Sequence, residues 1–454
     1  MIDLASFIPE ELKRMAKLFP EKAPLYVVGG FVRDAIEFNK ASSDIDIASG
    51  LTPPELAYVL KDSEFKLKAA SPRLGTMIVK GVNSYEYTAF RTDSYPQGAG
   101  DHAPQEVTFT RSLDKDARRR DFKCNAVYYD ITNDRIIDPL NGIEDIQNKI
   151  LSTTIEPDTV LSQDGLRIMR LARMVATLGY KVEENTLKAA TEQAWRLKDI
   201  SVERISTELV KILVGKNAYD GLSLLREIGA IKYIIPELDV CDKFPQPEKF
   251  HKYDVLEHTF KCVEYAPRKI RVAALLHDVA KPVCQETDGN MYKHDIVGAR
   301  MAKKILTRMK FPKQIIDHTE ELVAAHMFNI GLTAKKATLR RFIVTHIDNI
   351  QDIIALQKAD ALATGMVKEE DIKSPLADEL QEIKDKNIPT RLSDLKITGQ
   401  ILYDMGFRGK MIGSVLDEIF DNCVIGCIIN DKEGLEKYAQ RKLEKLNGAS
   451  NSNN

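Results

Sequence analysis

Two aspartates near the N-terminus, Asp44 and Asp46, have the type and spacing of ligands for divalent cations. The stretch 44–47 alternates polar and apolar residues with the period of a β-strand, so both carboxylates are expected on one face. A glycine pair, Gly29 and Gly30, precedes them, and glycine allows backbone N–H groups to approach a phosphate closely. Phosphates beside two metal-binding carboxylates indicate phosphoryl or nucleotidyl transfer.

The hydrophobic pattern predicts the elements that hold these residues. The apolar run 25–28 is typical of a buried strand that the glycine pair ends, and the amphipathic stretch 31–38 predicts the start of a helix. Residues 77–79 and 84–90 predict a hairpin, with Glu86 on its second strand. Mixed strands and helices are therefore expected up to about residue 150, and a helical pattern follows.

The order of these motifs resembles that of the class II tRNA nucleotidyltransferases and bacterial poly(A) polymerases. Their signature, Gly-Gly-x-Val-Arg-Asp followed by Asp-x-Asp, is matched at Gly29, Gly30, Val32, Arg33, Asp34, Asp44 and Asp46. The resemblance implies that the Asp44 and Asp46 carboxylates are catalytic and hold two Mg²⁺ ions, with Glu86 as a third carboxylate. It also implies that the glycine pair and Arg33 bind the nucleotide. The alternative for an isolated Asp-x-Asp is a solvated strand edge.

The stretch 119–126 resembles the Arg-Arg-Asp-Phe-x-x-Asn-Ala motif of this family. Asp121 and Asn125 are four residues apart, so on a helix they share a face, where a carboxylate and an amide can hold both ribose hydroxyls. Such an arrangement selects NTP over dNTP. Arg120 can reach a phosphate group. A helix cap with flanking charges is the alternative, although it explains Asp121 alone.

A Gln-Asp-Gly-Leu-Arg stretch resembles the family's Glu-Asp-x-x-Arg motif, with Asp164 and Arg167 expected side by side on one helix face. Cytosine and adenine both present an amino donor beside a ring-nitrogen acceptor, so an Asp–Arg pair complements C and A and rejects G and U. A surface salt bridge is the alternative. Arg170 and Arg173 continue a helical ladder of arginines in the nucleotide pocket, and Arg204 begins a later motif that resembles one supporting this pocket.

A glycine-rich stretch, 93–104, predicts a mobile loop. The family carries a flexible loop here that is implicated in the switch from C to A addition. Many members have arginines near its end, whereas this chain has Asp101, His102, Ala103 and Pro104. This departure leaves a CC-only enzyme open beside full CCA addition.

Seven of the eight histidines lie between residues 251 and 346. Imidazole and carboxylate groups together suit a transition metal or a mixed binuclear site. A first His, an adjacent His-Asp and a distant Asp resemble the HD phosphohydrolase superfamily, and two further histidines match members that hold two metals. The implied ligands are His258, His277, Asp278, His294, His326 and Asp360. The implied metal is a divalent transition metal, Mg²⁺ or Mn²⁺, and the implied reaction is phosphate-ester hydrolysis; a purely structural HD domain is the alternative.

The composition sets broad limits. The chain has 454 residues, 44% of them hydrophobic and 29% charged, typical of a soluble protein with about three domains of ~150 residues. The formal net charge is −2, so binding of nucleic acid requires local basic surface. The six cysteines include no Cys-x2-Cys pair, which argues against a structural zinc site. No signal peptide or membrane span is visible, and a cytoplasmic protein without a membrane partner is expected.

We therefore predict an α+β nucleotidyltransferase head with a small mixed sheet, followed by all-helical domains. The head is expected over 1–150, a helical neck and body with the nucleobase-recognition helix over 151–245, an HD metal-binding domain over 250–370, and a helical tRNA-binding tail over 375–454. The predicted reaction is the addition of C, C and A to the 3′ end of tRNA from CTP and ATP, without a nucleic-acid template.

Three alternatives remain open. A CC-adding enzyme follows from the departure in the loop, and a poly(A) polymerase shares the head, although the absence of a long basic tail disfavours it. An HD phosphohydrolase whose head only binds tRNA is the third, and the intact Asp44 and Asp46 pair argues against it. The sequence gives no indication of the oligomeric state.

Overall fold

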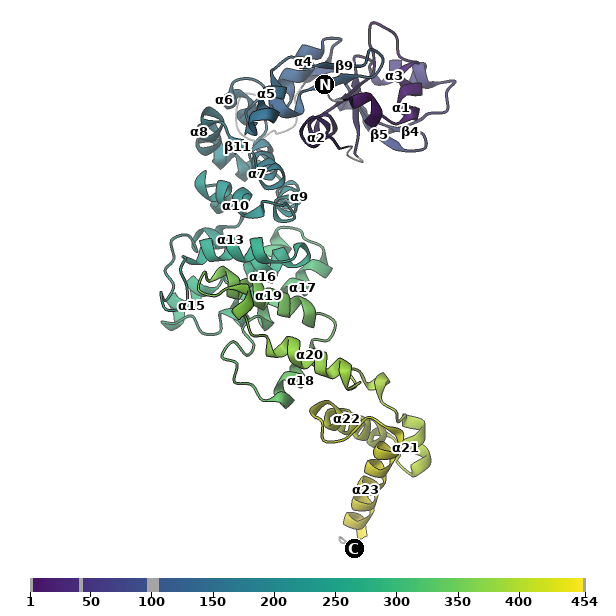
Figure 1. Cartoon of the computed structure of the whole chain (residues 1–454), viewed down its shortest axis with the longest axis vertical. Helices are drawn as coiled ribbons and strands as arrows, with labels where there is room; N and C mark the ends of the chain where they lie inside the picture. The colour runs from purple at the N-terminus through teal and green to yellow at the C-terminus, as the bar shows by residue number, and fades with distance from the viewer. Residues whose placement is uncertain (1–2, 41–43, 96–105, 452–454) are drawn as a thin grey trace. The chain divides into compact units, whose positions relative to one another are not determined.

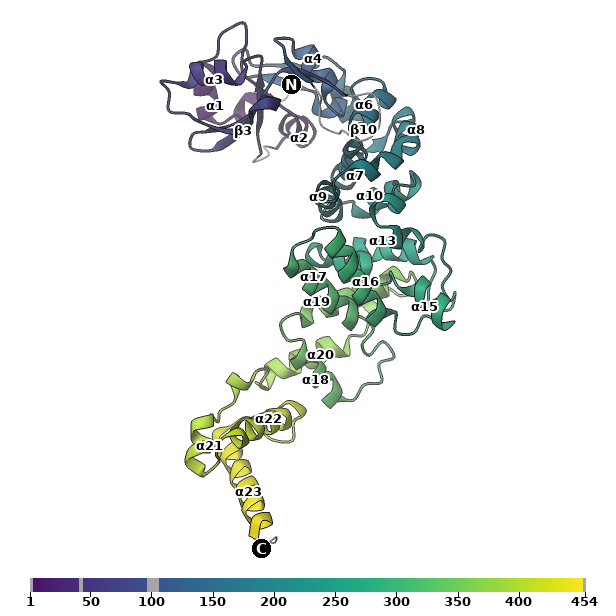
Figure 2. The ribbon, with the colours of Figure 1, turned by 180° about the vertical axis from the view of Figure 1, so that it is seen from behind.

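The computed structural model of the chain consists of two compact units (Figures 1 and 2). Unit 1 comprises Met1–Asp239 and Arg308–Phe311, and unit 2 comprises Val240–Thr307 and Pro312–Asn454. The residues that the structure describes are 3–40, 44–95 and 106–451. The division of the sequence into four domains stays a prediction.

A seven-stranded mixed sheet forms the centre of the N-terminal part of unit 1. Its strand order is β3-β4-β5-β2-β1-β8-β9. The bounds are β1 Tyr26–Val28, β2 Asp46–Ser49, β3 Lys66–Ser71, β4 Thr76–Lys80, β5 Ser84–Ala89, β8 Tyr128–Asp130 and β9 Arg135–Ile137. Only β2 and β5 are parallel, and the other neighbouring pairs are antiparallel. The expectation of a small mixed sheet is confirmed.

Strand β1 forms within the apolar run 25–28, and all three residues of this strand are buried. Gly29 is the N-cap of α2 (Gly30–Phe38) and has φ +84°, a conformation that glycine adopts without strain. The predicted hairpin is formed by the antiparallel pair β4 and β5. Ile45 and Ile47 are buried while Asp44 and Asp46 are exposed, so the predicted alternation of faces is confirmed.

Helices cover this sheet and continue the chain after it. The first 150 residues contain η1 Leu4–Phe7, α1 Glu10–Ala16, α3 Pro53–Leu60, η2 Pro72–Leu74, α4 Leu113–Arg119, η3 Lys123–Asn125 and α5 Gly142–Asn148. The rest of unit 1 contains α6 Pro157–Gln163, α7 Leu166–Leu178, α8 Glu184–Gln193, η4 Ala194–Asp199, α9 Val202–Leu213, α10 Ala218–Glu227, α11 Ile231–Ile234 and α12 Pro236–Asp239. Helix α7 packs against α9 and α10, and α2 packs against α5.

Two small sheets complete unit 1. Strands β10 (Ile150–Leu151) and β11 (Lys181–Val182) pair in parallel, and β6 (Arg91–Ser94) and β7 (Glu106–Phe109) pair antiparallel. Strand β6 includes Asp93, which the sequence placed in the glycine-rich loop. The residues of that loop on which the CC-only alternative depends, 101–104, lie outside the described residues.

Unit 2 is helical throughout its described residues. Its elements are α13 Val255–Tyr265, η5 Arg268–Ile270, α14 Arg271–Leu276, α15 Lys281–Asp288, α16 His294–Arg308, α17 Lys313–Ala325, α18 Lys336–Thr345, α19 Ile350–Ala363, η6 Glu369–Asp371, α20 Pro375–Asp385, η7 Leu392–Asp394, α21 Gly399–Met405, α22 Lys410–Ile425 and α23 Lys432–Asn451. Helices α13, α14, α17 and α19 pack together, and α13, α17 and α19 lie side by side in both ribbon views (Figures 1 and 2). None of the described helices combines the length and apolarity that a membrane span requires.

Candidate active sites

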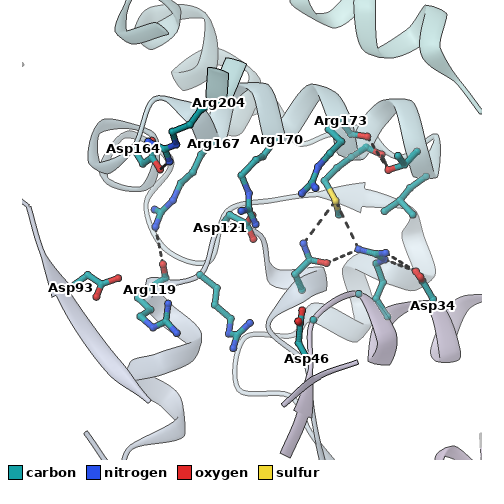
Figure 3. A pocket seen from close by; sticks show the side chains of 18 of the residues that line it. Asp34, Asp46, Asp93, Arg119, Asp121, Asp164, Arg167, Arg170, Arg173 and Arg204 are labelled. Carbon is teal, nitrogen blue, oxygen red and sulfur yellow. Dashed lines mark hydrogen bonds and ion pairs between the residues drawn. The ribbon is translucent and has the colours of Figure 1, made fainter. Parts of the chain in front are cut away.

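A cavity of about 900 Å³ opens in unit 1 (Figure 3). Its walls come from α2, β2, β6, α7, α9 and the segment after α4. Arginines and aspartates dominate the described lining: Arg33, Arg91, Arg119, Arg120, Arg167, Arg170, Arg173, Arg204, Asp34, Asp46, Asp93, Asp121 and Asp164. Figure 3 shows Arg167, Arg170 and Arg173 projecting from α7 on one side and Asp46 on the opposite side. The excess of cations suits a polyanion such as a triphosphate.

Three carboxylates meet where β2 and β5 run in parallel. Asp46 pairs in register with Glu86, so the two side chains project from the same face of the sheet. The surrounding walls take Asp46 partly out of water, and this burial, with the charges of Asp44 and Glu86, raises the pKa of Asp46 to about 6. Mutual repulsion of this kind is relieved by a divalent cation, so the donor set fits the metal that a nucleotidyltransferase head implies.

The glycine pair lies beside these carboxylates. A Cβ on Gly29 would lie 3.3 Å from Asp46 Oδ2, so the missing side chain leaves the approach to Asp46 open. Gly30 is the first residue of α2, and both glycines line the cavity. The N–H groups at the start of this helix have no intrahelical acceptors, which makes them suitable donors to a phosphate.

Asn125 is held by Arg33. Arg33 Nη1 donates to Asn125 Oδ1 at 2.6 Å, and Arg33 Nε donates to Asp34 Oδ1 at 2.9 Å. The contact uses the carbonyl side of the Asn125 amide and turns both residues towards the cavity, which they line. The structure thus brings these two predicted site residues together.

The expectation that Asp121 and Asn125 share a helix face is wrong. Helix α4 ends at Arg119, Arg120 is extended, and only Lys123–Asn125 forms a short 3₁₀ turn. The backbone around Asp121 pairs with a second segment instead: Phe122 forms a β-bridge with Thr153. This pairing prevents continuation of the helix, although Asp121 and Asn125 still line the same cavity.

Asp121 is buried and neutralised by the arginine ladder. Arg170 Nε donates to Asp121 Oδ2 at 2.8 Å, and the Phe122 N–H donates to Asp121 Oδ1 at 2.9 Å. Burial raises the pKa of Asp121, but the positive charges of Arg170 and Arg167 outweigh it and hold the pKa at about 2. Asp121 is therefore a carboxylate at any physiological pH.

Asp164 and Arg167 do not share a helix face either. Asp164 lies between α6 and α7 with φ −148°, and its Oδ1 accepts from the Leu166 N–H at 3.0 Å. Asp164 is the extended C-cap residue of α6 and Gly165 is the N-cap of α7, so α7 begins after Asp164 and not through it. The prediction of one shared helix is wrong, because the backbone is extended at Asp164, between the two helices.

Both residues nevertheless line the cavity, each with a protein partner (Figure 3). Asp164 Oδ2 accepts from Arg204 Nη2 at 2.9 Å. Arg167 Nη2 donates to Arg119 O at 2.8 Å, and its Nη1 donates to Gln163 Oε1 at 3.0 Å. Arg173 Nε in turn lies 3.1 Å from the Glu208 carboxylate on α9.

The carboxylate of Asp116 holds Arg119 and Arg120, and the sequence patterns above did not predict it. Asp116 on α4 is fully buried, and its Oδ1 accepts from Arg119 Nε at 2.7 Å. Its Oδ2 accepts from Arg120 Nε at 3.2 Å and from the Tyr128 hydroxyl at 2.7 Å. The spacing of three and four residues to the two arginines was the available signal. Arg91 and Asp93 on β6 also line the cavity, and the sequence analysis did not predict them as site residues.

A second site lies in unit 2, where six predicted ligands meet. Ligand atoms of His258, His277, Asp278 and Asp360 lie within 4.8 Å of one another, as do those of Asp278, His294 and His326. His258 Nε2 is 3.0 Å from Asp360 Oδ1, and His277 Nε2 is 3.2 Å from Asp278 Oδ2. Asp278 belongs to both groups.

Three of these histidines are oriented by the backbone. The Nδ1 atoms of His277, His294 and His326 lie 2.7–2.8 Å from the carbonyl oxygens of Ala274, Met291 and Val323. A proton on Nδ1 leaves the Nε2 lone pair free for a metal ion, as in most metal-bound histidines. His294 Nε2 and His326 Nε2 have no hydrogen-bond partner among the described residues, which fits a metal-binding role.

Charge in the cluster also favours a cation. Burial lowers the pKa of His277, but the carboxylates of Asp278 and Asp360 outweigh burial and raise it to about 10. Burial lowers the pKa of His326 to about 4. The carboxylates therefore stabilise positive charge at the centre of the cluster, where a divalent ion would lie.

Comparisons with known proteins identify the family of the chain. Three family models match: Poly A polymerase head domain over 25–152, Probable RNA and SrmB- binding site of polymerase A over 179–241, and HD domain over 251–352. The CCA-adding enzyme of Ligilactobacillus salivarius is 30% identical over 448 residues, covering 96% of this chain and 98% of the relative. The chain belongs to the CCA-adding enzyme family.

Other members of the CCA-adding enzyme family and its neighbours are similar over most of the chain. The CC-adding tRNA nucleotidyltransferase of Thermus thermophilus is 29% identical over 372 residues, covering 78% of this chain and 80% of the relative. The crystal structure of the Bacillus stearothermophilus CCA-adding enzyme in complex with CTP has the same fold, with TM-score 0.68 and 22% identity over 97% of this chain and 98% of that one. The class II family and the HD domain expected from the sequence are confirmed.

In this member of the CCA-adding enzyme family, Asp116→Asn is expected to raise KM for the nucleotide about tenfold with little change in kcat. The substitution removes the charge that fixes Arg119 and Arg120, and a hydrogen bond to a charged group contributes about 1.5–3 kcal/mol. The measurement is incorporation rate against nucleotide concentration. Asp114→Asn on the same helix, which frees only the exposed Arg118, is the matched control. An unchanged KM in Asp116→Asn would contradict the role of this residue.

Proposed function

We propose that the chain adds C, C and A in this order to the 3′ end of tRNA, with CTP and ATP as substrates bound in the cavity of unit 1. The observation that carries the proposal is the meeting of Asp46 and Glu86 on one sheet face, opposite an arginine ladder on α7. Carboxylates on one side and cations on the other suit a metal-bound triphosphate.

Each predicted site residue has a place in this proposal. Asp44, Asp46 and Glu86 would hold two Mg²⁺ ions, which supply activation of the RNA 3′-hydroxyl and stabilisation of the leaving pyrophosphate. The N–H groups at Gly29 and Gly30 and the guanidinium groups of the cavity bind the phosphates. Asp121 and Asn125 face the ribose. Asp164 and Arg167 face the base edge, and a base that binds there exchanges the contacts that the two residues make with Arg204 and Gln163.

The assay uses a tRNA transcript that ends at position 73, with CTP alone, ATP alone or both, resolved at single nucleotides. The addition of three residues ending in A, only with both nucleotides, supports the proposal. Two added C residues and a stop would make the protein a CC-adding enzyme, and a long A ladder from ATP alone would make it a poly(A) polymerase.

The substitution Asp164→Asn is expected to relax the choice of base. An asparagine amide can donate to the O4 carbonyl of uracil, whereas the Asp164 carboxylate only accepts. One good bidentate contact contributes roughly 1–3 kcal/mol of discrimination, so UTP incorporation relative to CTP should rise by roughly 10- to 100-fold. The measurement is kcat/KM for each nucleotide, with Asp158→Asn on α6 as the exposed control. Unchanged discrimination would remove Asp164 from the base contact.

Incorporation should depend on pH through Asp46. Its pKa of about 6 means that a proton competes with the metal ion near and below that pH. At a Mg²⁺ concentration below saturation, the incorporation rate should fall as pH decreases through about 6, and added Mg²⁺ should restore it. A rate that is independent of Mg²⁺ at low pH would contradict this explanation.

We further propose that the cluster in unit 2 binds two divalent ions, either a transition metal or Mg²⁺ or Mn²⁺, and hydrolyses phosphate esters. The six ligands and the orientation of their Nε2 atoms support this proposal. The test is hydrolysis of p-nitrophenyl phosphate to p-nitrophenol and phosphate, and hydrolysis of a nucleoside 2′,3′-cyclic phosphate to the nucleoside monophosphate, each with and without added metal. We place the protein in the cytoplasm, where tRNA and both nucleotides are available.

A further inference from the structure

A half-buried imidazole beside the metal cluster, His251, has no function in the sites described above. Its ring lies 5.0 Å from the His258 ring, centroid to centroid, and the two planes are perpendicular. Its Nδ1 is buried and has no hydrogen-bond partner among the described residues. A buried ring nitrogen without a partner costs stability, so a partner is expected in the working protein.

The Nδ1 atom of His258 also lacks a hydrogen-bond partner among the described residues. The Nε2 atom of His258 faces the cluster, 3.0 Å from Asp360 Oδ1, whereas its Nδ1 is buried. The other three cluster histidines of the described chain place Nδ1 against a backbone carbonyl. Among the cluster histidines of the described chain, His258 is therefore the one whose Nδ1 has no hydrogen-bond acceptor. The neighbouring ring of His251 has a nitrogen that could be this acceptor.

Two contacts fix the segment that carries His251. Lys281 Nζ donates to Gln246 Oε1 at 2.7 Å, which attaches the segment to the start of α15 next to the His-Asp motif. The Lys252 N–H donates to Thr364 O at 2.9 Å, which attaches it to the end of α19. These contacts, on either side of His251 in the chain, hold its ring against His258.

We propose that His251 is the outer-sphere partner of His258: the Nδ1 lone pair of His251 accepts a hydrogen bond from the His258 Nδ1–H. The two rings are adjacent, and each has a buried Nδ1 without a hydrogen-bond partner among the described residues. The bond keeps the His258 proton on Nδ1 and its Nε2 lone pair directed at the metal position. His251 is thus a positioning residue that acts through His258, and the inference rests on the proposed metal binding in unit 2.

Metal affinity of the full chain tests this inference. Mn²⁺ is titrated into metal-free protein by calorimetry, in an Asp46→Asn background that weakens the signal of unit 1 and is the same for every variant compared. His251→Ala is expected to weaken binding about 10- to 100-fold, the effect typical of a lost outer-sphere partner. His251→Gln, whose amide oxygen can accept the same hydrogen bond, should restore most of the affinity. His318→Ala, in the same unit but paired with Asp352, is the matched control and should leave affinity unchanged.

Two results of this titration would overturn the inference. One is unchanged affinity in His251→Ala. The other is affinity in His251→Gln as low as in His251→Ala, because packing alone would then explain the residue. A second measurement does not depend on metal. In ¹⁵N-histidine-labelled, metal-free protein, the His258 Nδ1–H proton should give a slowly exchanging resonance that disappears in His251→Ala. If the unsubstituted protein shows this resonance but its cluster does not bind Mn²⁺, the proposed metal site is refuted and the proposed hydrogen bond is supported. Absence of the resonance would refute the hydrogen bond itself.

Discussion

Asp46→Asn is expected to abolish nucleotide incorporation and to leave the fold intact. Asp46 faces the cavity of unit 1 from the first position of β2, so an amide of the same size causes no steric conflict. The substitution removes one of three carboxylates that meet at the β2–β5 pair. Metal-assisted stabilisation of a phosphoryl transition state contributes several kcal/mol, and each ~1.4 kcal/mol is a factor of ten in rate. The expected loss in kcat is therefore about 10³-fold or more.

The measurement is single-turnover incorporation of CMP on a tRNA acceptor at saturating Mg²⁺, together with thermal unfolding of each variant. Asp62→Asn, an exposed aspartate of the same unit, should retain full activity. Removal of the mutual repulsion should leave the unfolding temperature of Asp46→Asn equal to or above that of the unsubstituted protein. Full incorporation by this variant would refute the assignment of the catalytic carboxylates.

The second large effect is expected from Asp278→Asn in unit 2. Asp278 is buried and belongs to both groups of candidate metal ligands, so in the proposed two-metal site its loss removes one ligand from each ion. Binding of both ions and hydrolysis of phosphate esters should disappear. Incorporation of CMP and AMP should remain, because the residues that line the incorporation cavity all belong to unit 1.

Metal content by elemental analysis, ester hydrolysis and tRNA incorporation are measured on one preparation. Asp317→Asn, an exposed aspartate on α17, is the control and should leave all three unchanged. Asp278 Oδ2 also lies 2.6 Å from Nζ of the buried Lys281, so Asp278→Asn removes the negative charge beside this ammonium group and can destabilise the fold. Circular dichroism must therefore show that the variant keeps its helices. Retention of two ions in a folded Asp278→Asn protein would contradict the proposed role of Asp278 as a ligand of both ions.

Local sequence patterns correctly predicted the strands and the helix that surround the Asp46 carboxylate. The apolar run of β1, the helix α2 after a glycine pair and the hairpin of β4 and β5 each depend on residues close in the chain. Glu86 was placed beside Asp46 only by family resemblance, since the parallel pairing of β2 with β5 joins segments about 40 residues apart. Hydrophobic period alone does not specify such a pairing.

The errors arose where another segment or a helix end decided the backbone. Pairing of Phe122 with Thr153 ended the helix expected through Asp121, and Asp164 lies between α6 and α7 instead of within α7. The functional residues that were missed, Asp116 and His251, act through other side chains. The spacing of Asp116 to Arg119 and Arg120 was a weak signal in the sequence, whereas the proposed role of His251 is visible only in the three-dimensional arrangement.

The register of β2 with β5 limits where the enzyme can change shape. Asp46 and Glu86 belong to interior strands of a sheet whose neighbours are hydrogen-bonded on both sides, so their spacing is fixed throughout the reaction cycle. The residues opposite them lie on helices and connecting segments, among them Arg204 and Asp164. In the proposed function, the protein accepts first one base and then another, so the catalytic carboxylates stay in place while the residues that contact the base change their conformation.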